Sequence, residues 1–579
     1  FSTSLSPLFR GEPGLVTTER GGGVTVWVQN CSPTAINLKR GESVGELECV
    51  QGRHLEKVKV EEIFQAFNVS AAPLPPSLSQ ERRQQILKDL NLNVPIEERE
   101  KYLKIIFDNH DVFSRTKSDL GRANNYEHSI TLRNNEPLYI KQFKIPEVHR
   151  TMLEEQVKEW LKLGIIQRSN SKYNSPVFIV PKKEPGTFRF VQDFRKLNQN
   201  SMDDKYCMKD VSECIGEIGR AGSTIFSTLD LTSGFWQMPL SQESRKYTAF
   251  TIPGMGQFEW LVSAMGLKSC PGGFQRLVEL AMQGLDSVIV YIDDLILHST
   301  SHESHRADLQ RLLDRLRKSG LKVNLKKCFF GSNNVSYLGF RLTPNGILPG
   351  TDKLSAVKGA LPPRNVHQVR QFLGLCNFFR SHVRNFSTIA NPLNQLTRKD
   401  SPWRGGQLHE AALKAFNELK RALCSEPIVA YPRKNRMYSV IVDAATGNAT
   451  QEGGLGAILC QQDEKGRFNV ISYASRALVK HEKNYTPFLL EMTSAVWAMG
   501  YFDTYLRGKH FKLFTDHRPL EKLATVHKKT LNRLQEAMLD YNFEIIYKCG
   551  KEMPADFLSR NVLESIDVFN SELPNMQKK

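Results

Sequence analysis

Two adjacent carboxylates, Asp293 and Asp294, stand inside the apolar run Ser287-Val-Ile-Val-Tyr-Ile-Asp-Asp-Leu-Ile-Leu-His298. The aliphatic and β-branched residues around them predict a buried strand or a tight hairpin. Burying two neighbouring carboxylates without a partner is costly, and a divalent cation is the usual remedy. A surface Asp-Asp turn is the simpler alternative. The pattern favours a metal site on a strand.

A third carboxylate, Asp230, ends another short apolar run, Ser227-Thr-Leu-Asp. Carboxylates on neighbouring strands can hold two divalent cations, of which one lowers the pKa of an attacking hydroxyl and the other neutralises a leaving pyrophosphate. Phosphoryl transfer depends mainly on positioning and charge stabilisation, so acidic ligands on rigid strands suit it. We expect Asp230 and Asp293 to bridge both cations, with Asp294 supporting them. These three residues are called the first acidic site.

Four single acids follow later in the chain, and each belongs to a predicted secondary-structure element. Two end strand-like runs, one lies on the apolar side of a predicted helix, and one begins a short helix. They are Asp443, Asp516, Glu491 and Asp556, called the second acidic site. Each could be a helix cap or a solvated terminus by itself. Their combination favours a second catalytic centre.

Several sequence boxes, taken together, resemble the reverse transcriptase and ribonuclease H region of the Pol polyprotein of gypsy-type LTR retrotransposons (Metaviridae). The polymerase boxes are Tyr-Ile-Asp-Asp, Leu-Asp-Leu-Thr-Ser-Gly-Phe, Met265–Gln275, Phe188–Asn198 of the fingers, the primer-contacting hairpin Tyr337–Ile347, and Val369–Arg380 of the thumb. The ribonuclease H boxes are the second acidic site with Ser472–Leu478 and Glu482–Tyr485. The resemblance covers residues 130 to 562.

The resemblance implies a role for every acid. Asp230, Asp293 and Asp294 would hold Mg²⁺ at a polymerase site. The four residues of the second acidic site would hold Mg²⁺ at a ribonuclease H site, with two ions per site and Mn²⁺ as a substitute. The family commonly has Asn where this chain has Met553, and the turn at 448–452 is unusually long, so Asp556 departs most from the pattern.

Nucleotide contacts are implied in the same way. Arg189, with Lys182 or Lys183 nearby, would contact the triphosphate of the incoming nucleotide, although solvated charges at a hairpin tip are the alternative. Phe235 would lie under the sugar and leave no room for a 2′-hydroxyl, whereas periodicity alone would make it a core residue.

The remaining implied contacts surround the first acidic site. Met265 and Gln275 would line the nucleotide pocket, and Tyr291 and Gly339 the template–primer path. Gln275 and Tyr291 could instead be structural. The family usually carries an aromatic residue at the position of Met265, so we expect a differently shaped pocket, because Met is a flexible filler.

The implied fold is an α/β (α+β) right-hand polymerase with fingers, palm and thumb, followed by a ribonuclease H-like mixed-sheet domain. The expected divisions are a β-rich post-protease-like segment at 1–70, a Pro-rich linker and helical segment at 71–130, fingers and palm at 131–350, a thumb at 351–435, ribonuclease H at 436–562, and a tail at 563–579. Arg82–His110 is predicted to be helical, with Ile86, Leu87, Leu90, Ile105 and Ile106 facing inwards.

Composition agrees with a polyanionic partner. The formal net charge is +17 over 579 residues, and ten cysteines form no Cys-x-x-Cys pair, which favours free thiols over a disulfide framework or zinc knuckle. No apolar run reaches transmembrane length, so no membrane partner is expected. The chain begins at Phe1 rather than Met, and we hypothesise excision from a longer polyprotein.

The function expected from this resemblance is RNA- and DNA-directed DNA synthesis with degradation of RNA in RNA–DNA hybrids, in replication of an LTR retrotransposon. The implied partners are an RNA template, a DNA primer, the hybrid, deoxynucleoside triphosphates and a tRNA or other RNA primer, with a dimer left open. The implied location is cytoplasmic virus-like particles, with the nucleus open. The alternatives are a host-adopted relic that binds nucleic acid without catalysis and a hybrid nuclease with an inert polymerase half.

Overall fold

The structure is a computed structural model that describes residues 78–116, 118–181, 188–425, 428–447, 452–518 and 529–548, and four short strands before them. These strands pair as β1 (Phe9–Gly11) with β2 (Val28–Asn30) and β3 (Leu47–Glu48) with β4 (Leu55–Glu56). They belong to a compact unit, Phe1–Leu74, and all other described residues belong to a second unit, Pro75–Lys579.

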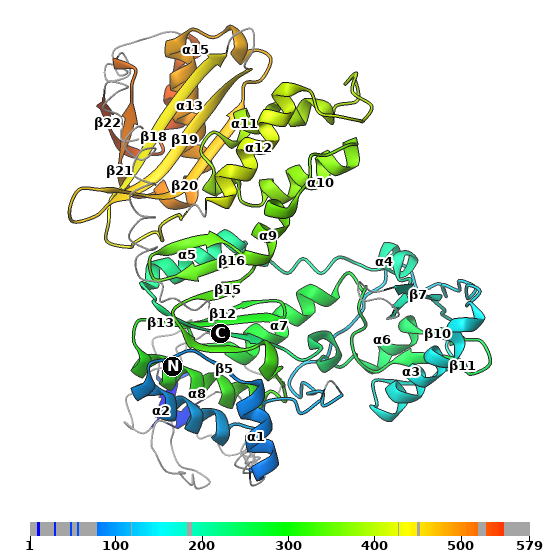
Figure 1. Cartoon of the computed structure of the whole chain (residues 1–579). Helices are drawn as coiled ribbons and strands as arrows, with labels where there is room; N and C mark the ends of the chain where they lie inside the picture. Colours follow the sequence, from blue (N-terminus) through cyan, green and yellow to red (C-terminus); the bar gives the residue numbers. More distant parts are fainter. Residues whose placement is uncertain are drawn as a thin grey trace, which may run out of the picture. The chain divides into compact units, whose positions relative to one another are not determined.

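A five-stranded sheet carries the first acidic site (Figure 1). Its order is β12-β13-β9-β14-β5. The bounds are β5 (Asn91–Leu92), β9 (Ile225–Asp230), β12 (Val288–Tyr291), β13 (Asp294–Ser299) and β14 (Phe329–Ser332). β13 pairs antiparallel with both β12 and β9, and this register places Asp294 opposite Asp230. The sheet therefore brings together acids that lie more than sixty positions apart in sequence.

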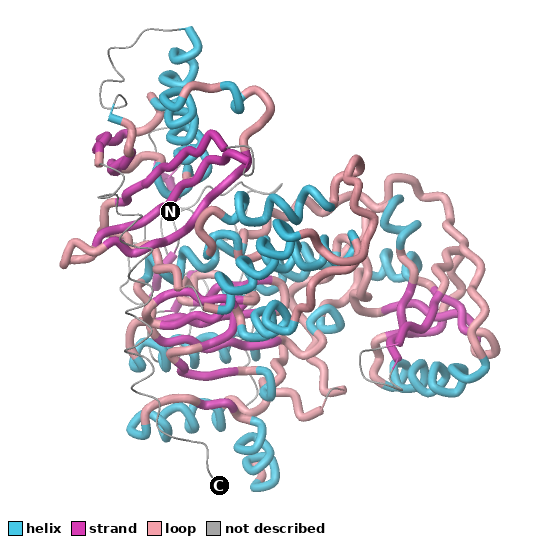
Figure 2. Tube along the Cα trace, turned by 45° about the horizontal axis from the view of Figure 1, so that its top comes forward, coloured by secondary structure: helices cyan, strands magenta, loops and turns pink. Residues whose placement is uncertain are grey.

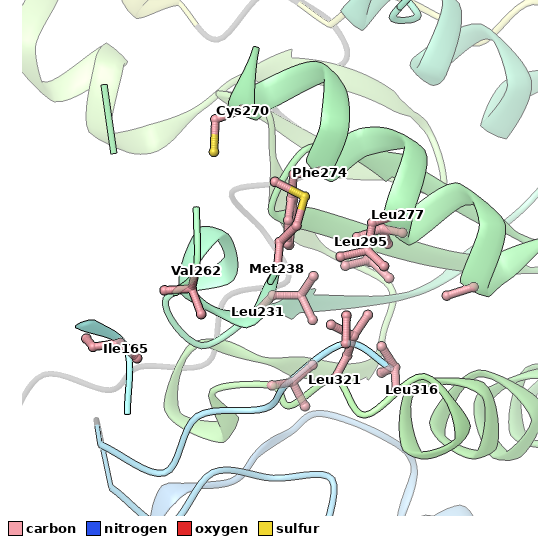
Figure 3. Close-up of a cluster of buried hydrophobic side chains, with 14 of the residues drawn as sticks. Ile165, Leu231, Met238, Val262, Cys270, Phe274, Leu277, Leu295, Leu316 and Leu321 are labelled. Atoms are coloured by element: carbon pink, nitrogen blue, oxygen red, sulfur yellow. The ribbon is translucent and has the colours of Figure 1, made fainter. Parts of the chain in front are cut away.

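Helices α7 (Cys270–Met282) and α8 (His302–Lys318) bury their apolar sides against this sheet. In Figure 3, Leu277 of α7 lies close to Leu295 of β13, and Leu231 and Met238 follow on from β9. Leu277 and Leu295 are both fully buried. Burying each side chain of this size stabilises the fold by about 1.5–3 kcal/mol, so the strands that hold the acids have a rigid support.

Two smaller sheets stand beside this one. They have the orders β10-β11-β6 and β7-β8. Their elements, with the neighbouring helices, are α3 (Arg150–Lys162), β6 (Ile166–Arg168), β7 (Val177–Pro181), β8 (Phe188–Gln192), α4 (Arg195–Asn200), α5 (Val211–Ala221), α6 (Gln242–Arg245), β10 (Phe250–Ile252) and β11 (Gly256–Trp260). Trp160, Trp236 and Trp260 pack against one another with centroid distances of 5.0–6.0 Å, which joins these sheets to the turn after β9.

The expected helix at 82–110 is two helices, α1 (Gln80–Asp89) and α2 (Ile96–Asp108). The break follows from β5, which pairs with β14, and from Pro95, which caps α2. Ile86 and Ile106 are fully buried as expected, but Leu87 is 46% exposed, so the prediction that it faces inwards is wrong. The buried side of α1 therefore includes Ile86 but not its neighbour Leu87.

A three-stranded sheet and a group of helices follow. Their bounds are β15 (Val335–Tyr337), β16 (Phe340–Thr343), β17 (Gly346–Pro349), α9 (Thr351–Gly359), α10 (Val366–Asn377), α11 (Phe386–Leu396) and α12 (Glu410–Cys424). Phe372 of α10 and Phe416 of α12 lie 4.5 Å apart, centroid to centroid, in a core that also includes Leu393 of α11.

The last sheet has the order β20-β19-β18-β21-β22 (Figure 1). It is mixed, because β18, β21 and β22 run parallel whereas β18, β19 and β20 alternate. Its elements are β18 (Tyr438–Gly447), β19 (Glu452–Gln462), β20 (Phe468–Ala477), α13 (Pro487–Tyr501), α14 (Asp503–Leu506), β21 (His510–Thr515), α15 (Lys529–Met538) and β22 (Asn542–Tyr547). Figure 2 shows the strands in magenta and the helices in cyan. These mixed sheets with packed helices agree with the predicted fold class. No helix in the described part of the chain is long and apolar enough to span a membrane.

Two candidate active sites

The first acidic site is built on a two-residue hairpin turn. Tyr291 and Asp294 pair across the turn, and Ile292 and Asp293 form it. Ile292 has φ +54°, a left-handed conformation that is costly for a β-branched residue. Such strain persists only where the surroundings impose it, and it is common at functional sites. The turn projects Asp293 toward the end of β9, where Asp230 lies.

Gln275 of α7 holds this turn from below. Its Oε1 accepts the Ile292 N–H at 2.6 Å, and its Nε2 donates to the Val290 carbonyl at 2.9 Å and to Glu279 at 2.7 Å. The side chain is 1% exposed. Because the amide is engaged with protein on both sides, this arrangement agrees with a structural role for Gln275, and its nucleotide contact stays a prediction.

Asp293 is the most perturbed acid of the first site. Burial raises its pKa to about 6, and the negative charges of Asp230 and Asp294 add to the rise. Its Oδ1 is buried without a hydrogen-bond partner among the described residues. A Cβ at Gly234 would collide with this oxygen, so the glycine of the Leu-Thr-Ser-Gly-Phe box makes room for the carboxylate. An unsatisfied buried carboxylate oxygen is an open ligand position.

Lys327 is a residue of this site that the sequence analysis missed. Its Nζ lies 3.1 Å and 3.2 Å from the two carboxylate oxygens of Asp230. The same charge opposes the rise in pKa of Asp293 and Asp294. Only the Lys326-Lys327 pair marks it in the sequence, and a basic pair has no specific meaning until β14 pairs beside β9.

The first acidic site has the kind of ligand atoms that a divalent cation binds, but its side chains do not converge on one point. Three carboxylates, one with an orphaned buried oxygen, are the hard oxygen ligands that Mg²⁺ prefers. No three acidic, histidine or cysteine side chains in the described part of the chain already converge on a single point. Lys327 forms an ion pair with Asp230, one of the three carboxylates.

The other expected contact residues surround the site unequally. Arg189 is exposed on β8, and Lys182 and Lys183 lie outside the described residues. Phe235 packs edge-on against Phe274, with 5.5 Å between ring centroids, and is partly buried. These positions leave the predicted nucleotide contacts as predictions.

Three further contact residues have distinct surroundings. Met265 is 56% exposed, so its side chain is available at the surface. Tyr291 is partly buried at the end of β12. Gly339 has φ +84°, and a Cβ there would lie 2.7 Å from Lys353 Nζ, so the β15–β16 turn requires glycine.

The second acidic site joins two adjacent strands and a helix. β18 and β21 pair in parallel up to Ile441 opposite Phe514, so Asp443 and Asp516 each follow two positions after this last pair. Glu491 of α13 is 3% exposed, and its Oε1 accepts a hydrogen bond from the Thr515 hydroxyl at 2.9 Å. The structure thus brings together Asp443, Glu491 and Asp516, whereas Asp556 lies outside the described residues.

The electrostatics of this site repeat those of the first. Burial raises the pKa of Glu491 to about 7, the Thr515 hydrogen bond opposes the rise, and the charges of Asp516 and Asp443 add to it. Burial also raises the pKa of Asp443, and the nearby charge of Arg384 opposes that rise. Arg384 comes from the segment just before α11, and the sequence analysis did not foresee its place here.

Two family models match this chain. Residues 180–342 match "Reverse transcriptase (RNA-dependent DNA polymerase)". Residues 445–541 match "RNase H-like domain found in reverse transcriptase". The first match contains the first acidic site, and the second contains Glu491 and Asp516 and begins just after Asp443.

Curated relatives agree with these matches. The chain is 36% identical over 450 residues to the retrovirus-related Pol polyprotein from transposon opus of Drosophila melanogaster, covering 74% of this chain and 44% of the relative. It is 30% identical over 494 residues to the Pol polyprotein from transposon gypsy of the same organism, covering 82% of this chain and 46% of the relative. The chain therefore spans less than half the length of these curated relatives.

A solved structure shares the fold. The foamy viral protease-reverse transcriptase in complex with an RNA/DNA hybrid aligns with a TM-score of 0.67 and 21% identity, covering 82% of this chain and 64% of that one.

Replacing Gln275 with leucine is expected to loosen the hairpin turn. The variant leaves the Ile292 N–H and the Val290 carbonyl without their partners, at about 1–3 kcal/mol for each unsatisfied group. Amide hydrogen exchange at Ile292 should accelerate at least tenfold. Gln283→Ala, at the exposed end of the same helix, is the control and should leave this exchange rate unchanged. Equal protection of Ile292 in both variants would contradict the assignment.

Lys327→Met is expected to strengthen cation binding at the first acidic site. The methionine removes an ammonium group that competes with the cation for Asp230, although its exposure keeps the effect to about three- to tenfold. Mn²⁺ titration followed by electron paramagnetic resonance measures the affinity. Lys326→Met, which removes the neighbouring charge paired with Asp89, serves as the control. Weaker Mn²⁺ binding by Lys327→Met would show that the lysine does not compete.

Proposed function

Because the chain belongs to the reverse transcriptase–ribonuclease H region of LTR-retrotransposon Pol polyproteins, we propose that it copies RNA and DNA templates into DNA and degrades the RNA of the resulting hybrid. It contains a reverse transcriptase domain and a ribonuclease H-like domain. The observation that carries the proposal is that acids gather in each domain. Asp294 pairs with Asp230 beside Asp293 in the first domain. Asp443, Glu491 and Asp516 lie close together in the second. Each domain thus has its own acidic centre.

Domains of both kinds generally use divalent cations, and we propose two Mg²⁺ ions in each centre, with Mn²⁺ as a substitute. When bound, these ions lower the pKa of the attacking hydroxyl or water and neutralise the leaving oxygen. Asp230, Asp293 and Asp294 would hold them in the polymerase, and Asp443, Glu491, Asp516 and Asp556 in the ribonuclease H. Clustering so many acids is costly without a cation, and no other role is expected for these residues.

In DNA synthesis, the chain's own groups would position the primer 3′-hydroxyl in line with the α-phosphate of the nucleotide. Gln275 keeps the Ile292–Asp293 turn in register, so that Asp293 faces Asp230. Phe235 would limit the space at the sugar, and Arg189 would contact the triphosphate. Lys327, whose ammonium lies beside Asp230, would add positive charge to the surroundings of the developing negative charge.

In RNA cleavage, the protein fixes the second acidic site from two sides. Thr515 holds Glu491 in one orientation, and the Ser494 hydroxyl donates to the Asp443 carbonyl at 3.3 Å, which ties α13 to β18. A rigid arrangement of this kind is what positioning an attacking water requires. The RNA strand of the hybrid is the proposed substrate.

The proposed partners are an RNA template, a DNA primer, RNA–DNA hybrid, deoxynucleoside triphosphates, and a tRNA or other RNA that starts synthesis. The net charge of +17 supports a nucleic-acid partner, since phosphate contacts dominate such binding. A dimer and a location in cytoplasmic virus-like particles are also part of the proposal. The domain limits proposed from sequence, with fingers and palm at 131–350 and ribonuclease H at 436–562, are kept. No observation favours a non-catalytic relic.

Asp293→Asn and Asp443→Asn should separate the two activities. A dye-labelled DNA primer on an RNA template with a second dye, incubated with Mg²⁺ and four deoxynucleotides, reports extension and RNA cutting together. We expect at least a hundredfold loss of extension in the first variant and of cutting in the second, since removing a charged metal ligand costs several kcal/mol. Asp286→Asn, at an exposed aspartate before β12, should retain both activities. Binding of the hybrid by the wild-type protein with neither product would overturn the proposal.

A further inference from the structure

The start of α11 lies on the sheet face that carries Asp443. Val440 and Val442 of β18 pack toward α13, so the alternation of the strand turns Ile441 and Asp443 to the opposite face. On that opposite face α11 contacts β19 and β20, and Figure 1 shows α11 beside these strands. A helix from the segment before the last domain therefore covers part of that domain's catalytic face.

Three hydrogen bonds to one residue, Ser475 of β20, fix α11 in this place. The Ser387 N–H donates to Ser475 Oγ at 2.9 Å, and the Ser387 hydroxyl donates to the Ser475 carbonyl at 2.7 Å. Arg380, in the turn before α11, donates to the same carbonyl at 2.7 Å. Because backbone and side-chain donors meet one strand position, the helix start has a defined register against the sheet.

Glycines in β19 let two polar side chains of α11 approach the catalytic strand. Gly456 is the cross-strand partner of Asp443, and a Cβ on it would lie 3.0 Å from Asn385 Oδ1. A Cβ on Gly454 would lie 3.1 Å from Thr388 Oγ1. Neither glycine has a positive φ, so they are needed here for space and not for backbone freedom. A larger residue at either position would crowd the Asn385 and Thr388 side chains.

A cavity of about 440 Å³ opens between these two surfaces. Asn385 and Thr388 line one side, and Asp443, Ala445 and Gly456 line the other. Arg384 adds a positive charge close enough to act on the Asp443 carboxyl. The cavity is large enough for about one nucleotide unit. An amide, a hydroxyl and a guanidinium are the groups that bind phosphate oxygens and the ribose 2′-hydroxyl.

We propose that the first turn of α11 is a wall of the ribonuclease H cleft, where Asn385 and Thr388 hold the RNA strand beside Asp443 by hydrogen bonds to its sugar–phosphate backbone. This inference rests on the proposed ribonuclease H function and adds to it that the substrate site includes residues ahead of the domain. Asn385 and Thr388 are positioning residues, because they orient the strand and the acids carry out its cleavage.

The test uses the whole chain and an RNA–DNA hybrid with a dye-labelled RNA strand, cut in Mg²⁺ over a range of hybrid concentrations. Asn385→Gly removes the amide and keeps the left-handed backbone, since Asn385 has φ +52°. Thr388→Val removes the hydroxyl with little change in shape. We expect the double variant to raise the KM for cutting about five- to tenfold with kcat within about twofold, as loss of two hydrogen bonds implies.

Two controls separate positioning from folding. Thr388→Ser as a single substitution keeps the hydroxyl and should have the wild-type KM. Thr397→Val removes a hydroxyl at the far end of α11, where it donates to the Asn394 carbonyl of the same helix, and should change nothing. Primer extension, measured in the same samples, should stay unchanged in all variants.

The outcomes distinguish this inference from the proposed function. Unchanged KM in the double variant, while Asp443→Asn abolishes cutting, overturns the role of α11 and leaves the ribonuclease H function standing. Faster cutting by the double variant also overturns it, because α11 would then obstruct the cleft. Absence of cutting by the wild-type protein overturns the proposed function and this inference with it. A defect in Thr388→Ser equal to that in Thr388→Val would make the role structural.

Discussion

Negative charges held close together at the edges of buried strands are the constraint on which the rest of this structure depends. Burial and mutual repulsion raise the pKa of Asp293 to about 6 and of Glu491 to about 7. Folding alone does not favour such clusters, because each ionised carboxylate loses solvation and gains a like-charged neighbour. The protein tolerates this cost in two places, and the divalent cations proposed for each site would offset it.

Each acidic site is supported by a neutral polar side chain that is itself buried or nearly so. Gln275 fixes the turn that carries Asp293, and Thr515 fixes Glu491. In both places glycine supplies the space, since Gly234 makes room for Asp293 and Gly456 for Asn385. Gln275 lies on α7, away from the hairpin that carries Asp293, and Thr515 lies on β21, away from the helix that carries Glu491. The geometry of each site therefore belongs to the packing between elements and not to any one strand.

Sequence reasoning found the acids because a carboxylate in an apolar run is locally conspicuous, and Asp230, Asp293, Asp443 and Glu491 all lie in such runs. It could not find Lys327, which reaches Asp230 only after β14 has paired with β9, nor the place of α11 beside Asp443. It left the role of Gln275 open between a nucleotide contact and a structural one, because a motif marks a position without saying which way the side chain points. The break at Pro95 was visible in sequence, but the continuous apolar pattern on either side of it outweighed the proline.

The most direct test of this account is the thermal unfolding of wild type and Asp293→Asn with chelator and with Mg²⁺, at about pH 8. A folded-state pKa raised to about 6 means that Asp293 favours folding only when protonated, so its contribution is lost as pH rises through that value. In chelator the midpoint of the variant should therefore lie about 2–4 °C above that of wild type for each ~1 kcal/mol of folding free energy that the ionised Asp293 costs. Mg²⁺ should raise the wild-type midpoint more than that of the variant. A less stable variant in chelator, with equal Mg²⁺ shifts in both proteins, would contradict the claim that these acids are clustered to hold cations.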